Sequence, residues 1–449
     1  MASLKGKSTE SAFGAFSKAG DLQKRILFTL IALVVFRFGT FVPLPGINPD
    51  VLKEIFTPSA AGGFLGMLDT FAGGALSRMT LLALNIMPYI SASIIIQLGA
   101  AIVPALIALK KEGESGHRKM NQYTRYLTVL ITVLQGYGLA VAIEHMTSAS
   151  GASAVIMTSP WLFRLTTVVS LLGGTMFVVW LGEQITARGV GNGTSLIITA
   201  GIIAEIPSAF ARTFELSRVG TLSPMIVAGV LVMIVALIYI VVFIERAQRR
   251  IVIQYPKRQQ GMRVSTGANS YFPLKINPTG VMPPIFASAL LMLVISGVQF
   301  LANKNMAWAE SAQAWMNRGS IGYMVIYGAL IAFFTFFYTG IVFNPTETAD
   351  NLKKHGGFIA GIRPGKSTAE YLDYVVTRLT VFGAAYLTTL CVIPEVLISE
   401  MSIPFFLGGT TLLIVVTVIM DTMMQIQSHL VAYQYEGLIR KAQLKGRRS

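Results

Sequence analysis

The sequence contains little charge and almost no cysteine. Only 13% of its 449 residues are charged and 53% are hydrophobic, whereas an ordinary soluble domain carries about 25% charged residues. This composition excludes a typical soluble globular protein. The single cysteine, Cys391, cannot form an intrachain disulfide, and it lies within an apolar run. We therefore expect Cys391 to be a small core residue rather than a redox centre.

The sequence also lacks the motifs of enzymes. It has no HExxH, no P-loop and no GxSxG, and its four histidines are scattered without ligand spacing. The run GVGNG at 189–193 is glycine-rich, but it lacks the strand and the lysine that a phosphate-binding loop needs. We therefore expect no enzymatic activity, no catalytic residues, no metal site and no cofactor.

What the chain has instead is a series of long apolar runs. About 20 apolar residues cross a bilayer, so a chain of this length can hold about ten spans. The first 25 residues are polar, and no cleavage site follows the first apolar run, so we expect no cleavable signal peptide. We expect transmembrane helices at 24–42, 78–103, 121–143, 160–182, 193–210, 223–244, 279–301, 321–343, 373–393 and 403–424.

The net charge of +15 is distributed unevenly between the two sides of these spans. With the N-terminus inside, about 26 Lys and Arg residues lie on the inner side and about six on the outer side, as the positive-inside rule requires. Both termini are then cytoplasmic, and the number of spans is even. The expected fold is an all-α integral membrane protein.

The same pattern divides the chain after the fifth span. We expect two halves of five spans that begin on opposite sides of the membrane, which allows an inverted repeat of the kind found in secondary transporters. The expected parts are an N-terminal segment at 1–23, an N-terminal half at 24–210, an external hinge at 211–222, a C-terminal half at 223–424 and a tail at 425–449.

Two cytoplasmic connections, 245–277 and 344–371, are long and basic. The run RRIVIQY in the first alternates apolar and polar residues, which predicts a strand and a hairpin. Basic loops beside a membrane bind anionic lipid headgroups. Headgroup contact does not require folded loops of about 30 residues, so their length favours docking of a soluble partner.

The stretch from Gly62 to Val103 begins with a glycine-rich segment that is too short to cross the membrane and too apolar for a water-exposed loop. Such a segment can lie at membrane depth only where protein surrounds it or where it lines a water-filled cavity. This pattern predicts a funnel or pore with a segment folded into it.

Few ionisable residues fall inside the spans, and none suggests a midplane relay. Arg37, Glu205 and Asp421 lie toward span ends, where we expect them to reach the interface or to pair locally between helices. The residues expected at mid-depth are mostly β-branched and apolar. Such a collar could exclude ions by dewetting, although periodicity alone fits packing or lipid-facing residues as well. The candidates are Ile86, Ile90, Thr194, Ile198, Ile285 and Ile414.

Several motifs together resemble the bacterial SecY family, the central subunit of the Sec protein-conducting channel. The resemblance extends over almost the whole chain in order, and the outer loops at 144–159 and 301–320 are the least similar parts. The motifs are FRFGTFVPLPGI (36–47), GGALSRMTLLALNIMPYISASIIIQL (73–98), KKEGESGHRKMNQYTRY (110–126), WLGEQITARGVGNGTS (180–195), ERAQRRIVIQYPKRQQG (245–261), NPTETADNLKKHGGFIAGIRPG (344–365) and IMDTMMQIQS (419–428).

The resemblance implies a central hourglass pore in which the six mid-depth candidates form the pore ring, with Thr194 departing from the usual aliphatic residue. It implies that spans two, three, seven and eight form a lateral gate, tuned by polar residues such as Ser91, Gln97 and Gln135. It also implies a short plug helix at about 62–75. The plug residues are Gly63, Phe64, Leu65, Met67, Leu68 and Phe71.

The resemblance further implies a passive channel for unfolded polypeptides in the bacterial cytoplasmic membrane, with sideways release of apolar segments into lipid. The implied partners are SecE, SecG, the SecA motor ATPase, the ribosome, signal sequences, nascent chains, anionic lipids, SecDF and an insertase. The implied docking residues are Arg249, Arg250, Lys257, Arg258 and Arg363. The rival interpretation is a secondary transporter, which a midplane ionisable pair would favour.

Overall fold

The computed structural model describes residues 20–48, 51, 69, 72–144, 154–156, 159–220, 223–255, 258–260, 263–265, 269–302, 308, 311–312, 315–316, 320–401 and 408–446. Its principal helices are α2 (Gly20–Gly39), α5 (Met87–Ile102), α6 (Pro104–Lys111), α7 (Glu114–Glu144), α8 (Pro160–Arg188), α9 (Gly193–Arg218), α10 (Pro224–Arg246), α11 (Met282–Ala302), α13 (Ile321–Val342), α14 (Pro345–Lys354), α15 (Lys366–Met401) and α16 (Gly409–Gly446). Its strands are β1 (Gln248–Gln254), β2 (Arg258–Gln260), β3 (Arg263–Ser265), β4 (Asn269–Lys275) and β5 (Phe358–Ile359).

The chain forms two compact units. The first contains residues 1–97, 108–211 and 414–449, and the second contains residues 98–107 and 212–413. One boundary between them falls after Ala211, within the segment that we expected to be an external hinge. The exact halves expected from the charge pattern stay a prediction.

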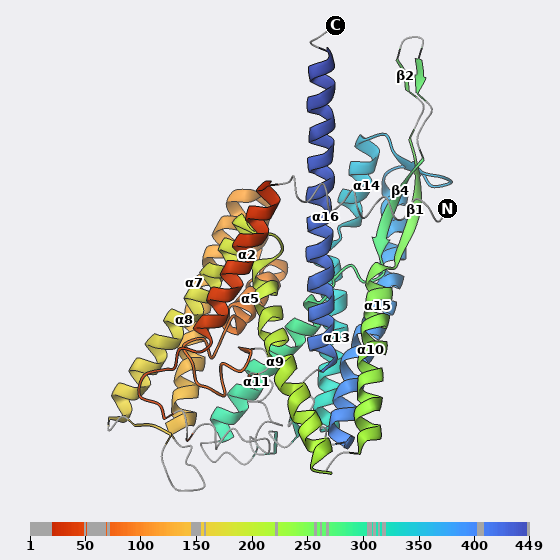
Figure 1. The fold of residues 1–449 in the computed structure, drawn as a ribbon. Coiled ribbons are helices and arrows are strands. Elements are labelled where there is room, and N and C mark those ends of the chain that lie inside the picture. Colours follow the sequence, from red (N-terminus) through yellow and green to blue (C-terminus); the bar gives the residue numbers. More distant parts are fainter. Residues whose placement is uncertain are drawn as a thin grey trace. The chain divides into compact units, whose positions relative to one another are not determined.

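In the first unit, α2, α7 and α8 lie side by side (Figure 1). The face of α7 that is buried carries a small residue at every fourth position: Thr124, Thr128, Thr132, Gly136 and Ala140. Small residues at this spacing let membrane helices approach closely. The hydroxyls of Thr128 and Thr132 each donate to the carbonyl oxygen four residues earlier, so the stripe buries no unsatisfied hydroxyl at these positions.

Ion pairs join α7 and α8 near both ends of their contact. Arg125 on α7 donates through two nitrogens to the carboxylate of Glu183 on α8, at 2.6 and 3.0 Å. Near the other end, Arg164 on α8 donates to Glu144 on α7 at 2.8 Å. The pairing of Arg125 agrees with our expectation that charges near span ends pair between helices.

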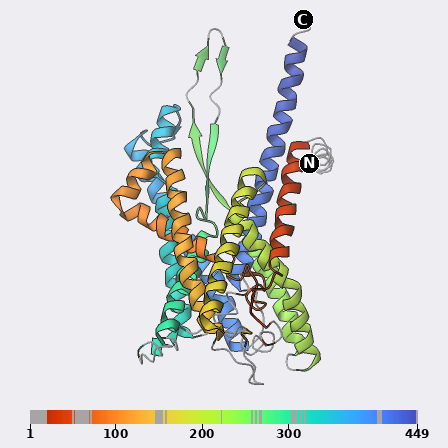
Figure 2. The same ribbon diagram turned by 90° about the vertical axis from the view of Figure 1, so that its left-hand side faces the viewer.

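In the second unit, α13 packs against both α11 and α15, and α15 also contacts α14. Strands β1 and β4 form a long antiparallel hairpin between α10 and α11, with β2 and β3 beyond them toward its tip (Figure 2). The sequence prediction of a strand and hairpin over RRIVIQY is therefore confirmed. In the part of the chain that the structure describes, these strands and β5 are the β component of an otherwise helical fold.

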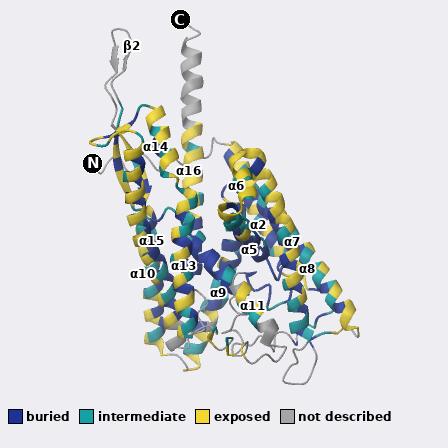
Figure 3. Cartoon of the chain, turned by 180° about the vertical axis from the view of Figure 1, so that it is seen from behind, coloured by how far each residue is buried: buried dark blue, intermediate teal, exposed yellow. Residues whose placement is uncertain are grey.

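The outward faces of the helices are exposed although they are apolar, as the colouring of α10 in Figure 3 shows. Val232, Val235, Tyr239 and Phe243 of α10 are all exposed. An apolar stripe of this size on a soluble protein would aggregate, whereas a bilayer accommodates it.

Each of the ten expected spans overlaps one of the helices α2, α5, α7, α8, α9, α10, α11, α13, α15 and α16. By length and composition, seven of the described helices can cross a membrane, or eight if the bent pair α5 and α6 is one span. α2 falls outside that number because charged residues lie near both of its ends, with Asp21, Lys24 and Arg25 at the start and Arg37 in the last turn. α11 falls outside it because only the shorter apolar stretch Met282–Ile295 qualifies.

The expectation of a continuous span at 78–103 is wrong in its first part. Residues 78–86 form turns, and the helix begins only at Met87. Met79 and Asn85 have φ angles of 43° and 48°, which an α-helix cannot contain. The helix then bends by 95° into α6, where Pro104 occupies the first helical position.

Candidate functional site

The stretch 72–86 has an irregular backbone, yet protein buries it. Ala75, Leu76, Met79 and Ile86 are each exposed by 1% or less. Irregular backbone at membrane depth needs internal hydrogen bonds, because lipid supplies none. We refer to residues 72–86 as the re-entrant stretch.

Much of this hydrogen bonding connects the re-entrant stretch to the segment after α2. The Leu44 amide donates to the Met79 carbonyl at 3.0 Å, and the Leu81 amide donates to the Val42 carbonyl at 2.9 Å. Pro43 and Thr80 form an isolated antiparallel bridge between these two contacts. The two segments thus support each other like a short pair of strands.

Glycines on two helices let the re-entrant stretch approach their backbones. A Cβ atom at Gly174 of α8 would lie 2.0 Å from the Leu81 carbonyl oxygen, which no side chain could tolerate. A Cβ atom at Gly73 would lie 2.9 Å from the Cα of Gly201 on α9. Gly73 also has a φ of 66°, a conformation that favours glycine.

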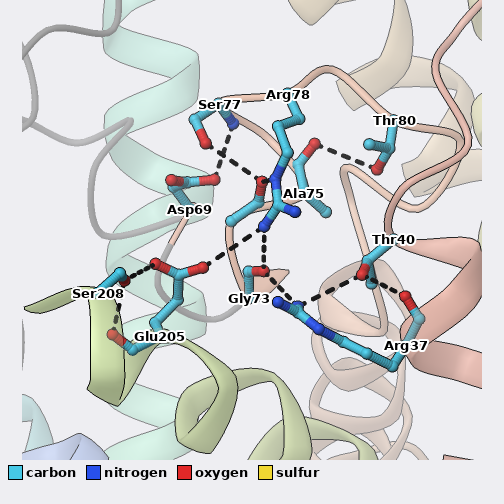
Figure 4. A network of polar contacts seen from close by, with 11 residues as sticks. Arg37, Thr40, Asp69, Gly73, Ala75, Ser77, Arg78, Thr80, Glu205 and Ser208 are labelled. Carbon is cyan, nitrogen blue, oxygen red and sulfur yellow. Dashed lines mark hydrogen bonds and ion pairs between the residues drawn. The ribbon is translucent and has the colours of Figure 1, made fainter. Parts of the chain in front are cut away.

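Two arginines bind the start of the re-entrant stretch (Figure 4). Arg37 of α2 donates to the Gly73 carbonyl at 2.9 Å. Arg78 donates to the same carbonyl at 3.2 Å and to the Gly74 carbonyl at 2.8 Å. Both guanidiniums also lie over the ring of Phe41, at 4.9 and 4.5 Å from its centroid. They therefore fix the backbone of this glycine pair from two directions.

Carboxylates complete the network. Glu205 of α9 lies 3.6 Å from Arg78 and accepts from the Ser208 hydroxyl at 3.0 Å. Asp69 accepts from the Ser77 amide at 2.8 Å. We refer to Arg37, Arg78, Asp69 and Glu205 with Gly73 and Gly74 as the glycine-pair network. Its two cations and two anions balance, as groups withdrawn from water require.

Sequence reasoning missed this network. We expected Arg37 and Glu205 to reach the interface or to pair locally between helices, and the structure shows that both contact the re-entrant stretch. Arg37 reaches a carbonyl 36 residues away in the chain, and Glu205 pairs with a residue outside the helices. Two glycines followed by an arginine in GGALSR were the only signal that could have suggested it.

The five isoleucines among the mid-depth candidates are buried. Ile86, Ile90, Ile198 and Ile414 belong to the first unit and are each exposed by 8% or less. Ile285 of the second unit is exposed by 6%. The interpretation of these residues as lipid-facing is therefore wrong, and both packing and a pore ring remain consistent with their burial.

Thr194 has a local structural role. Its hydroxyl donates to the Asn192 side-chain oxygen at 2.8 Å, and its amide donates to the same oxygen at 3.2 Å. Asn192 precedes α9 and so caps its N-terminus. The hydroxyl that distinguishes Thr194 from an aliphatic residue is thus already hydrogen-bonded.

The predicted plug residues Gly63, Phe64, Leu65, Met67, Leu68 and Phe71 lie outside the described residues. The predicted gate residues lie on two helices. Ser91 of α5 is buried, Gln97 donates to the Ser93 hydroxyl at 2.9 Å, and Gln135 of α7 is half-buried. Their roles stay predictions.

The two basic connections form one structure. Strand β1 pairs with β4 on one side and with β5 on the other, so the sheet order is β4-β1-β5. β5 belongs to the connection 344–371. Buried Ile251, Leu274 and Ile359 pack this sheet against Leu372 and Val375 of α15. We refer to the three strands with the exposed loop 360–365 as the basic platform.

The predicted docking arginines lie on this platform. Arg249 and Arg250 of β1 are exposed, and so is Arg363 in the loop after β5. The Arg363 carbonyl accepts from the Thr368 hydroxyl at 2.9 Å, which holds the loop against the start of α15. Lys257 lies outside the described residues, and for Arg258 only the backbone in β2 is described.

In the part of the chain that the structure describes, no group of histidine, cysteine or carboxylate side chains could hold a metal ion. The sites of interest are therefore the re-entrant stretch with its network, the buried isoleucines and the basic platform.

Comparison with known proteins connects these features. The SecY family model matches residues 80–423. The protein translocase subunit SecY of Rickettsia conorii is 50% identical over 432 residues, which cover 96% of this chain and 99% of the relative.

Two solved structures share the fold. A protein-conducting channel superposes with a TM-score of 0.66 at 18% identity, covering 92% of this chain and 93% of that one. Sec61 of the canine ribosome–channel complex superposes with a TM-score of 0.63 at 16% identity, with the same coverage. The expected helical membrane fold is thereby confirmed. The chain belongs to the SecY family, the non-enzymatic, multi-pass protein-conducting channel of the Sec translocase.

Proposed function

We propose that this chain conducts unfolded secretory polypeptides across a bacterial cytoplasmic membrane and releases apolar segments sideways into lipid. The observation that carries the proposal is the buried, irregular stretch 72–86 at the beginning of the second span. An unfolded polypeptide needs a wet path, because lipid cannot satisfy its backbone. Irregular backbone at membrane depth occurs only where protein buries it or where it lines such a path.

The path closes at an apolar ring formed by Ile86, Ile90, Thr194, Ile198, Ile285 and Ile414. A ring of aliphatic side chains dewets and so resists ions, and it yields to an extended polypeptide. The burial of the five isoleucines supports this role. The segment that includes residues 63–71 closes the outer side as a plug.

Sideways release uses a gate between the second and third spans on one side and the seventh and eighth on the other. Ser91, Gln97 and Gln135 tune its opening through interhelical hydrogen bonds. A client segment leaves through this gate when its transfer into lipid is favourable, with Leu, Ile and Phe each contributing about 0.3 to 0.6 kcal/mol at mid-bilayer.

The driving force comes from a partner that docks on the basic platform, because the sequence has no nucleotide-binding motif. The exposed side chains of Arg249, Arg250 and Arg363, which all belong to this platform, suit an acidic protein or RNA surface. The canine neighbour is part of a ribosome–channel complex, which supports the ribosome as one partner. SecA is the other driving partner, and Lys257 and Arg258 contribute to its docking.

SecE and SecG complete the channel, and SecDF and an insertase assist it. Both termini lie in the cytoplasm, and anionic lipids contact the basic inner segments. Signal sequences and nascent chains are the clients.

The direct test is crosslinking of a stalled secretory precursor to single cysteines placed at Ile86 and Ile285. Val232 of α10, which is 70% exposed, supplies the matched control on an outward face. We expect adducts at positions 86 and 285 and none at 232. Equal crosslinking at all three positions, or none at 86 and 285, would overturn the proposed path.

A further inference from the structure

A buried polar cluster lies where the hairpin of β1 and β4 joins the two helices that flank it. The chain enters this hairpin from Glu245, near the end of α10, and leaves it toward α11 through residues 276–281. Glu245, Asn277 and Thr279 are exposed by only 7%, 2% and 4%. Polar side chains are this deeply buried only when partners satisfy them.

Asn277 is the centre of the cluster. Its amide nitrogen donates to the Glu245 carboxylate at 2.8 Å and to the Gly280 carbonyl at 3.0 Å. Its amide oxygen accepts from the Thr279 hydroxyl at 2.8 Å. Both ends of this amide are thus engaged, which fixes the side chain in a single orientation.

The backbone around the cluster leaves little freedom. The Ile276 amide donates to the Ala247 carbonyl at 3.2 Å, directly beyond the last strand pair, Gln248 with Lys275. Gly383 of α15 lies against this point, since a Cβ atom there would be 3.3 Å from the Ile276 carbonyl oxygen. The base of the hairpin is therefore hydrogen-bonded to the end of α10 and packs against α15 at Gly383.

The cluster leads directly into α11. Gly280 turns the chain with a φ of 60°, and the Ile285 amide then donates to the Val281 carbonyl in the first turn of the helix. Pro283 and Pro284 stiffen that turn. Fixed contacts rather than a flexible linker connect the hairpin to the helix that carries Ile285.

We propose that Glu245, acting through Asn277, is a positioning residue that transmits docking on the basic platform to α11. This inference rests on the proposed function. A partner that tilts the β1 and β4 hairpin moves Glu245 and Ala247 at its base. The Glu245–Asn277 hydrogen bond makes the start of α11 follow that movement, whereas without it residues 276–281 would absorb the displacement.

The test separates docking from transmission in the full chain, reconstituted with its partner subunits in lipid vesicles. A fluorophore on a cysteine at Leu293, a 40% exposed position of α11, reports movement of the helix when SecA and ATP are added. Cys391 is fully buried and is replaced by serine in every variant. Binding of SecA to the same vesicles is measured in parallel.

For Glu245→Ala, we expect SecA affinity to stay within about twofold while the equilibrium between resting and displaced α11 shifts about tenfold toward resting, as loss of a hydrogen bond to a charged group predicts. Glu245→Gln keeps an acceptor for Asn277 and restores most of the response. Thr279→Val removes the hydroxyl that donates to the Asn277 amide oxygen. This substitution shifts the equilibrium of α11 in the same direction as Glu245→Ala but by less.

Asn344→Ala is the matched control. Asn344 caps α14 by accepting from the Glu347 amide at 3.3 Å and from the Thr346 hydroxyl at 2.6 Å. These hydrogen bonds are local to the start of α14, so the response should remain. A full response in both Glu245→Ala and Thr279→Val, or a loss of SecA affinity in parallel with the response, would overturn the inference. A wild-type chain that does not bind SecA would overturn the proposed function as well.

Discussion

Ile253 of β1 is paired in register with Ile359 of β5, although the two residues belong to different cytoplasmic connections. Both side chains are buried, at 3% and 6% exposure. A strand from the second connection thus completes the sheet of the first. The platform that results brings Arg249, Arg250 and Arg363 into one folded structure rather than into two independent loops.

Reversing the charge of Arg363 should weaken docking without unfolding the channel. Arg363 is exposed, and its backbone carbonyl, rather than its side chain, accepts the hydrogen bond from Thr368. We expect Arg363→Glu to reduce SecA affinity and secretion of a precursor by about tenfold, as loss of a charged interface contact predicts, while the protein still inserts into the membrane.

Lys353→Glu supplies the control for Arg363→Glu. Lys353 is also exposed, at the end of α14, and its reversal changes the net charge by the same amount. Affinity that falls equally in both variants would show a general electrostatic effect. Secretion that continues at the wild-type rate in Arg363→Glu would contradict the docking role.

Removing the carboxylate of Glu205 should loosen the glycine-pair network. The Arg78 and Glu205 side chains are only 31% and 23% exposed. We therefore expect this ion pair to contribute about 1 kcal/mol to stability, at the upper end of the range for exposed pairs. We expect Glu205→Ala to increase resting ion conductance in planar bilayers severalfold. Glu205→Gln, which can still accept from Arg78, should increase it less.

Glu144→Ala is the control for Glu205, because Glu144 belongs to another ion pair of the same unit, with Arg164 at 2.8 Å. That pair joins α7 to α8 and does not contact Gly73 or Gly74. We expect no added leak in this variant. If Glu144→Ala raises the resting ion conductance as much as Glu205→Ala, the leak reflects general loosening of the first unit. The proposal that the glycine-pair network itself limits the leak would then be wrong.

Thr194 should not make the proposed ring leakier, because its hydroxyl already donates to Asn192. We expect Thr194→Val to leave resting conductance unchanged and to cost about 0.5 to 1 kcal/mol of stability through the lost hydrogen bond to Asn192. Ile198→Thr, which adds a hydroxyl one turn further along α9, should raise conductance. Conductance that falls in Thr194→Val would show that the hydroxyl hydrates the ring after all.

The helices were predictable because their signals are local. Apolar runs and the side on which lysine and arginine lie specified the ten expected ranges, each of which overlaps a helix. The hairpin was predictable from alternation in RRIVIQY. The resemblance to the SecY family rested on motifs along the whole chain, and the comparisons confirm it.

The parts that the sequence could not predict depend on contacts between distant residues. Nothing local in FI at 358–359 indicates that these two residues extend a sheet whose central strand begins at Gln248. The helical hydropathy of TLLALNI hides the turns at 78–86, because burial in protein and helical packing need the same apolar residues. The reach of Arg37 to Gly73 depends on how α2 packs beside the re-entrant stretch.

Deleting residues 63–74 should open the resting channel to ions. The deletion removes the predicted plug residues together with Gly73 and Gly74, whose carbonyls accept from Arg37 and Arg78. The guanidiniums of Arg37 and Arg78 would then lose these carbonyl acceptors. The proposed plug would no longer cover the outer side of the proposed ring. We expect a clearly raised baseline current in planar bilayers, while precursor crosslinking at Ile86 persists. Deletion of the equally long outer-loop segment 303–314 should leave the current low. An unaltered baseline in the 63–74 deletion would mean that the isoleucines seal the membrane by themselves and that no plug is needed.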